Sequence, residues 1–136
     1  MIRCYRDLKQ LESFKERYYY LKLHGIVGEE TFGFDRYVNQ SLYRSPRWKL
    51  TRSKVIIRDN GCDLGIEGRD LSDYIIVHHM NPITLEDIEE ERDSIFDPEY
   101  LICCSPRTHK AIHFGDENLL PKDFVERRPN DTCLWR

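Results

Sequence analysis

The sequence predicts an α+β fold, in which a mainly helical N-terminal part packs against a small unit of two strands and one helix. Three observations lead to this prediction. Apolar residues recur at helical spacing before residue 60, and Ser-Pro pairs supply helix starts. Two short apolar runs follow at residues 74–77 and 100–104, each of a length typical of strands. With 136 residues the chain can build one modest core, so a single domain over residues 1–136 is expected.

Two helices are predicted before residue 45. Residues 6–23 carry apolar and aromatic side chains at helical spacing, and Thr31 is the predicted cap of a second helix that extends to Leu42. Each helix is expected to pack one face on the core. The apolar positions are Leu8, Leu11, Phe14, Tyr18 and Leu21 in the first helix and Phe34, Tyr37, Val38 and Leu42 in the second.

A third helix is predicted to begin after Ser45. Serine is a preferred N-cap residue, and Pro46 suits the first helical position because its fixed φ angle matches the helix. The helix is expected to end at the turn sequence Asp59-Asn60-Gly61. Trp48 is interpreted as a core residue rather than as a platform for stacking bases.

The two predicted strands flank a long connection. Residues 74–77 are rich in β-branched side chains and lead directly into His78 and His79, where the strand is expected to end. Thr84 resembles the cap of a short helix inside the connection. Residues 100–104 form the second predicted strand.

The helix after the second strand carries a histidine pair. Ser105 and Pro106 repeat the N-cap and first-position signature, and Gly115 closes the helix. His109 and His113 are four residues apart, so a helix places them on one face, where they can bind one cation. An imidazole from the neighbouring strand would complete a three-nitrogen site with open positions, and a fourth would remain for proton transfer.

The composition excludes several classes of protein. Hydrophobic residues make up 40% and charged residues 33% of the chain, and no apolar run approaches the roughly 20 residues of a membrane span. The N-terminus does not resemble a secretion signal.

The five cysteines include the adjacent pair Cys103 and Cys104 and no C-x-x-C. This pattern favours reduced thiols over a disulfide framework, as in a cytoplasmic protein, and the adjacent pair is expected on a buried strand. Residues 115–136 form a polar tail without a stronger prediction.

Charge is distributed unevenly along the chain, although the net charge is only −3. This asymmetry would direct a polyanion to one surface, or it would simply mark two solvated helix faces of opposite sign. The basic stretch contains Arg44, Arg47, Lys49, Arg52, Lys54 and Arg58, whereas the acidic stretch contains Glu86, Asp87, Glu89, Glu90, Glu91 and Asp93.

The order strand, His-His, connection, strand and helix with H-x3-H resembles the HNH endonuclease family, whose core is a ββα-metal finger. The segments VHHMNPI and LICCSPRTHKAIH carry this resemblance, which covers residues 74–114. The second segment is most similar to the variant found in colicin nucleases. More loosely, WKLTRSKVIIRDNGCDLG and ERRPNDTCLWR look like segments of small phage-encoded HNH proteins. On this resemblance residues 1–60 form a helical region that supports the finger and binds DNA.

The resemblance implies roles for the histidines. His78, His109 and His113 become ligands of one divalent metal ion, with Mg²⁺, Mn²⁺, Zn²⁺ and Ni²⁺ as candidates, and His79 becomes the general base. Tyr100 stands where the family has an asparagine that braces the loop of the base, so Asn81 or the Tyr100 hydroxyl is expected to give this support. The usual structural zinc of many relatives is not expected, because the C-x-x-C pairs are missing.

DNA is the expected substrate, and the resemblance implies a phage protein of the host cytoplasm that assists genome packaging beside a terminase. Three alternatives stay open: a catalytically silent DNA-binding or packaging accessory, a ribonuclease, and a toxin-like nuclease. The predicted phosphate contacts are Arg47, Lys49, Arg52, Lys54 and Arg58, with Arg107 and Lys110 near the reacting centre.

Overall fold

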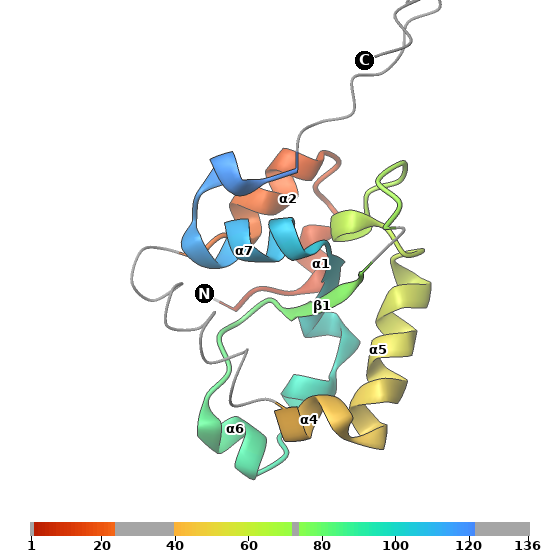
Figure 1. The fold of residues 1–136 in the computed structure, drawn as a ribbon, viewed down its shortest axis with the longest axis vertical. Coiled ribbons are helices and arrows are strands. Elements are labelled where there is room, and N and C mark those ends of the chain that lie inside the picture. The colour runs from red at the N-terminus through yellow and green to blue at the C-terminus, as the bar shows by residue number, and fades with distance from the viewer. Residues whose placement is uncertain (1, 24–39, 72–73, 122–136) are drawn as a thin grey trace, which may run out of the picture.

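The structure, a computed structural model, describes residues 2–23, 40–71 and 74–121. Within them a two-stranded antiparallel sheet of β1 (Ile76–His79) and β2 (Leu101–Cys104) lies between two groups of helices (Figure 1). This arrangement confirms the α+β prediction. The α-helices are α1 (Tyr5–Leu8), α2 (Phe14–Leu21), α4 (Gln40–Arg44), α5 (Pro46–Arg58), α6 (Leu85–Glu89) and α7 (Pro106–Phe114), and the 3-10 helices are η1 (Asp63–Gly65), η2 (Asp93–Phe96), η3 (Pro98–Tyr100) and η4 (Glu117–Leu119).

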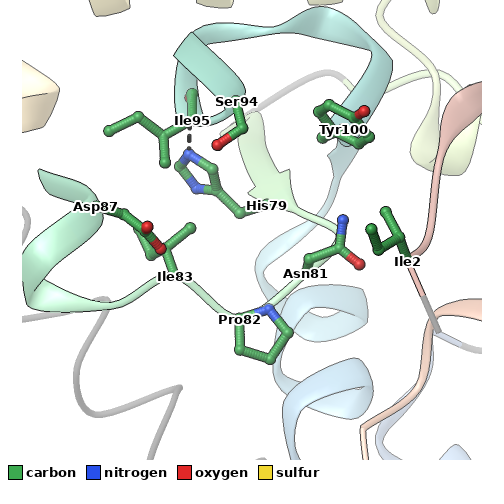
Figure 2. A pocket seen from close by; sticks show the side chains of 9 residues that line it. All are labelled: Ile2, His79, Asn81, Pro82, Ile83, Asp87, Ser94, Ile95 and Tyr100. Carbon is green, nitrogen blue, oxygen red and sulfur yellow. Dashed lines mark hydrogen bonds between the residues drawn. The ribbon is translucent and has the colours of Figure 1, made fainter. Parts of the chain in front are cut away.

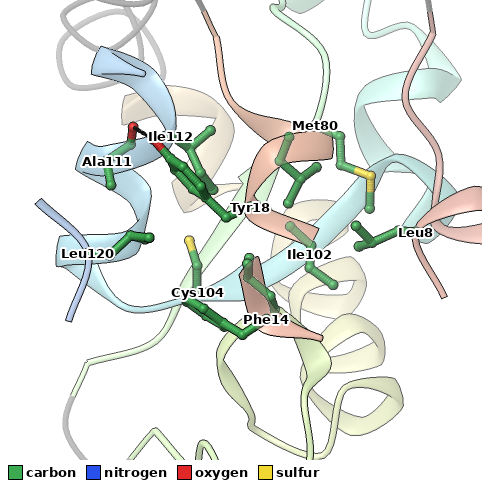
Figure 3. Packing of buried hydrophobic residues seen from close by; sticks show 11 residues of the cluster. Leu8, Phe14, Tyr18, Met80, Ile102, Cys104, Ala111, Ile112 and Leu120 are labelled. Atoms are coloured by element: carbon green, nitrogen blue, oxygen red, sulfur yellow. Dashed lines mark hydrogen bonds between the residues drawn. The ribbon is translucent and has the colours of Figure 1, made fainter. Parts of the chain in front are cut away.

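The two faces of the sheet pack against different helices. Ile102 belongs to a buried cluster with side chains of α1, α2 and α7 (Figure 3). Leu101 belongs to a second cluster, with side chains of α4, α5 and η2. His78 pairs with Ile102 across the sheet and His79 pairs with Leu101. Because successive residues of a strand point to opposite faces, His78 faces α7 and His79 faces α5.

Helix α5 begins and ends where the sequence predicts. The Ser45 Oγ accepts a hydrogen bond from the Trp48 N–H at 3.2 Å, Pro46 occupies the first turn, and Asp59 is the C-cap. Trp48 is only 3% exposed and Val55 is fully buried, so both anchor the helix on the sheet. The prediction that Trp48 is a core residue is confirmed.

The first predicted helix, over residues 6–23, is wrong as one continuous element. The chain forms α1 and α2 instead, because Ser13 starts a new helix by accepting a hydrogen bond from the Glu16 N–H at 3.1 Å. Leu8 and Tyr18 are nevertheless buried in one cluster, so the apolar spacing identified core residues without identifying the break. The helix predicted from Thr31 lies mostly outside the described residues, and its last part is α4.

The strand predicted over residues 74–77 is displaced by two residues. β1 starts at Ile76 and contains both histidines, because its pairing partner spans only Leu101–Cys104. The second strand and α6, which begins with a capping box at Thr84, agree with the sequence. Cys103 and Cys104 are fully buried free thiols, as expected. None of the helices in the described part of the chain combines the length and apolarity needed to cross a bilayer.

Two buried aspartates bind the edge of β2 that does not pair with β1. The Asp59 Oδ2 accepts a hydrogen bond from the Cys103 N–H at 3.0 Å, and the Asp63 Oδ1 accepts one from the Ser105 N–H at 3.2 Å. Asp63 also accepts a 2.7 Å bond from the Thr108 hydroxyl in the first turn of α7. These carboxylates satisfy backbone groups that a third strand would otherwise pair.

Replacing Asp63 with Ala is expected to reduce the free energy of unfolding by about 3 kcal/mol. The change leaves the buried Thr108 hydroxyl and the Ser105 N–H without this acceptor, and unsatisfied buried donors cost on the order of 1–3 kcal/mol each. Urea unfolding followed by circular dichroism measures the loss. Asp7→Ala, at an exposed carboxylate, is the control and should change stability by less than about 0.5 kcal/mol. Equal effects of the two changes would contradict a structural role for Asp63.

Candidate metal centre

Helix α7 presents two histidines from one face. The Ser105 Oγ accepts a hydrogen bond from the Thr108 N–H at 3.1 Å and Pro106 follows at the first helical position. Gly115 ends the helix with φ of 66°, a left-handed conformation that glycine adopts without strain. This short, capped helix fixes His109 and His113 one turn apart.

His78 completes a cluster of three imidazoles with these two residues. One potential ligand atom from each ring lies within 4.8 Å of the others. The ring centroid of His78 lies 5.2 Å from the centroid of His109 and 4.9 Å from the centroid of His113. The centroids of His109 and His113 are 4.5 Å apart. The rings meet at steep angles of 69° to 85°, so they do not stack. Among the described residues, this is the one group of three or more His, Cys, Asp or Glu side chains placed to hold a metal ion.

The burial of His78 agrees with a role as a metal ligand. Its side chain is 1% exposed, and neither ring nitrogen has a hydrogen-bond partner among the described residues. Such buried polar atoms are rare in native proteins and call for a bound ion or water. Burial lowers the pKa of His78 well below its usual 6.5, and positive charge on His113, His109 and His79 would lower it further. A neutral imidazole is the form that binds a metal.

The lowered pKa of His78 predicts a loss of stability in acid when a chelator is present. Unfolded His78 binds a proton as pH falls below about 6.5, whereas the folded, buried ring stays neutral until a lower pH, so protons favour the unfolded chain. The contribution of His78 to the free energy of unfolding is therefore complete above about pH 6.5. Below that pH it decreases by up to about 1.4 kcal/mol per pH unit. Urea unfolding at several pH values in EDTA measures the slope. His78→Leu should have a smaller slope, and an unchanged slope would contradict this origin.

His79 lies on the opposite face of β1, away from the three-histidine cluster. Its ring stacks on Trp48 with centroids 5.1 Å apart and planes 21° apart. Its Nε2 forms a 3.1 Å hydrogen bond with the Ile95 carbonyl oxygen (Figure 2). A carbonyl accepts only, so Nε2 carries the proton and, in the neutral ring, Nδ1 carries the lone pair. His79 is 6% exposed and lines a cavity of about 320 Å³.

Asn81 and Tyr100, the predicted supports of His79, both line the cavity beside it. The Asn81 side chain pairs with the backbone of Arg3, accepting from its N–H at 2.7 Å and donating to its carbonyl at 2.9 Å. The Tyr100 carbonyl accepts from the Met80 N–H at 2.9 Å, and its side chain lines the cavity next to His79. Asn81 therefore attaches the N-terminal segment to the chain after β1. One hydrogen bond that orients His79 comes from the Ile95 carbonyl of η2, a contact between distant segments that local sequence signals do not predict.

Two of the predicted phosphate contacts bind the protein itself. The Arg52 Nη2 donates to the Ile75 carbonyl at 2.8 Å, and the Arg58 Nη2 donates to the Leu101 carbonyl at 2.6 Å. Arg58 also forms an ion pair with buried Asp59 at 2.9 Å. These guanidinium groups are partly buried and stabilise the sheet edges, so positive charge on α5 is less available than the sequence suggests.

The remaining predicted contacts are exposed. Lys49, Lys54, Arg107 and Lys110 lie at the surface of α5 and α7. Arg47 is also exposed, although it pairs with Asp93 at 2.8 Å and lies over the Phe96 ring. The structure thus leaves exposed basic groups on both helices.

No family model, no curated protein and no solved structure matches the chain. The function therefore has to be inferred from the residues and their geometry.

Proposed function

We propose that this protein is a metal-dependent endonuclease that hydrolyses phosphodiester bonds of DNA. The observation that supports this most is the three-imidazole cluster of His78, His109 and His113, in which both nitrogens of buried His78 lack a partner among the described residues. Three neutral nitrogens are a donor set that divalent transition metals bind well. Three histidines fit a catalytic metal site better than a structural zinc site, because a structural zinc usually has four protein ligands that include cysteines.

The three histidines would hold the ion and leave part of its coordination shell open. His109 is only partly buried, so the cluster has a side open to solvent, whereas His78 and His113 are buried. A divalent ion bound by neutral ligands keeps its full charge and supplies Lewis acidity toward a phosphoryl oxygen. The protein contributes the position of the ligands and the exclusion of water behind His78.

His79 is the proposed general base. The Ile95 carbonyl holds the proton on Nε2, which fixes one tautomer of the neutral ring, and an imidazole is the side chain best suited to take a proton from water near neutral pH. Trp48 covers one face of the ring and restricts its rotation. A base with a fixed tautomer and a fixed orientation loses less entropy when the reaction begins.

DNA as the substrate and a role in phage genome packaging beside a terminase are supported by the sequence resemblance. Exposed Lys49 and Lys54 on α5, and Arg107 and Lys110 on α7, are the proposed phosphate contacts. The α7 pair is next to the proposed metal ligands in sequence.

One observation favours a second candidate, a metal-binding DNA or packaging accessory without catalysis. His79 is 6% exposed and points to the face of β1 opposite His78. In this candidate the metal stabilises the fold and the Trp48–His79 stack is part of the core.

Nicking of supercoiled plasmid tests the two candidates. Purified protein is incubated with Mg²⁺, Mn²⁺, Ni²⁺ or Zn²⁺, with EDTA as the control, and with matched DNA and RNA substrates. The proposal predicts metal-dependent conversion of supercoiled DNA to the open circle. Metal binding without cleavage of either polymer would favour the accessory role, and cleavage of RNA alone would favour the ribonuclease. Wild type and His109→Ala should be prepared in parallel, so that a contaminating nuclease appears in both.

A further inference from the structure

A cavity lies beside His79, on the side of the sheet away from the three-histidine cluster. It has a volume of about 320 Å³, opens to solvent, and is lined by the chain after β1, by η2 and by the N-terminal segment (Figure 2). This volume is at the lower end of the roughly 300–1,000 Å³ of typical ligand sites. It is large enough for one planar ring system with its sugar and too small for a base pair within a duplex.

The walls of the cavity suit a flat, mainly apolar ligand. In Figure 2, His79 and Ile83 lie on one side of the hollow, and Tyr100 and Ile2 lie on the other. Ile2 is 73% exposed at the rim and Ile95 is buried at the back. Aromatic rings beside aliphatic side chains form the kind of surface on which nucleic-acid bases stack.

The charge of the cavity favours a base over a phosphate. Among the described residues that line the cavity, Asp87 is the only one with a carboxylate, and none is a lysine or an arginine. The Asp87 Oδ2 accepts from the Thr84 N–H and its Oδ1 accepts from the Arg92 Nη1, both at 2.9 Å, so the carboxylate is held in place. Each carboxylate oxygen can accept a further bond. The exposed Ser94 hydroxyl adds a group that both donates and accepts.

We propose that this cavity binds one unpaired nucleobase of the polynucleotide, with the amino or ring N–H edge of the base directed at Asp87. The inference rests on the nuclease function proposed above, because that function supplies the polymer. His79 lines the cavity and is also the proposed general base, so the bound nucleobase would lie next to a residue of the proposed catalytic centre. A paired base has to leave the duplex stack before it enters such a pocket, and this step costs stacking and pairing free energy. The protein should therefore prefer single-stranded or locally unpaired substrates.

Binding in EDTA tests this preference without any cleavage. Fluorescence anisotropy compares a labelled eight-nucleotide single strand with the same sequence in a duplex, and a wholly abasic octamer with one that carries a single central adenine. The proposal predicts tighter binding of the single strand, and on the order of tenfold tighter binding of the octamer with the base, since stacking one base contributes about 1–3 kcal/mol. Equal affinity for the wholly abasic octamer and for the octamer with one adenine would overturn the proposal.

Filling the cavity provides the matched comparison. Ser94→Trp places a large ring at the rim from an exposed position and should abolish the gain from the single base. Asn118→Trp, an equally neutral and exposed change outside the cavity lining, should retain it. If Ser94→Trp does not fold, the wild type is titrated with adenosine 5′-monophosphate, and changes in its amide NMR chemical shifts test the site. Shifts at Ser94, Tyr100 and Ile83 are expected, and their absence would contradict the site.

The two proposals fail in different ways. If nicking depends on metal but the central adenine does not change octamer affinity, the nuclease proposal is supported and the nucleobase site is excluded. A base-dependent gain in affinity without any nicking would retain the pocket in a protein that binds nucleic acid without cutting it.

Discussion

Replacing His79 with Ala is expected to slow metal-dependent cleavage of DNA by about 10²–10⁴-fold, the usual contribution of a general base. The Ile95 carbonyl and Trp48 hold this imidazole in one tautomer and one orientation, and the variant loses the group that accepts the proton. Metal affinity should not change, because His79 lies on the other face of β1 from the ligands. Nicking rates of supercoiled plasmid and isothermal titration with Ni²⁺ measure the two properties separately.

His109→Ala is the reciprocal control for this prediction. It removes a proposed ligand from the partly exposed side of the cluster, so it should lose both metal binding and cleavage. Cleavage by His79→Ala at the rate of the wild type would show that this ring is not the base. It would then belong to the core, as the second candidate function requires.

Metal binding is expected to raise the stability of the protein substantially. An ion that binds only the folded chain adds about 2.7 kcal/mol at a concentration 100 times its Kd, and about 4.1 kcal/mol at 1,000 times. The gain is expected to be large here because the ion supplies a partner for the buried nitrogens of His78. Thermal unfolding with Zn²⁺ or Ni²⁺, compared with EDTA, measures the shift in Tm. His109→Ala should lose most of this shift, whereas His79→Ala should keep it.

An equal metal-dependent shift in His109→Ala and wild type would contradict the proposed ligand set. The partly exposed position of His109 makes it the best of the three for this test, since its removal disturbs the core least. Substitution of His78 or His113 would change both metal binding and packing, because both rings are buried.

Local sequence signals predicted the elements whose ends are fixed by their own side chains. Ser45 and Ser105 each cap a helix in the way that the sequence indicates, and Gly115 ends α7. These signals act within one helical turn, so they do not depend on the rest of the fold. The four-residue spacing of His109 and His113 is equally local, because any helix through them places both on one side.

Features that depend on distant segments could not be predicted in the same way. The continuous helix expected over residues 6–23 breaks at Ser13, although its apolar residues still reach the core. Arg52 and Arg58 look like surface charges in the sequence, yet they bind carbonyl groups of residues 23 and 43 positions away. Helical periodicity shows which side chains share a face, but it does not show what covers that face.

The sequence by itself determined a strand with two adjacent histidines and a helix with two more, because these patterns depend only on local spacing and capping. These local patterns do not show which strand histidine joins the helix; the family resemblance implies His78, and the tertiary structure places His78 beside His109 and His113. Strand alternation requires His78 and His79 to face opposite ways, and the packing of α7 on one side and Trp48 on the other assigns them. The physical reason is that each face of the sheet buries its own apolar cluster, so a shift of one residue would exchange the two imidazoles and expose both clusters.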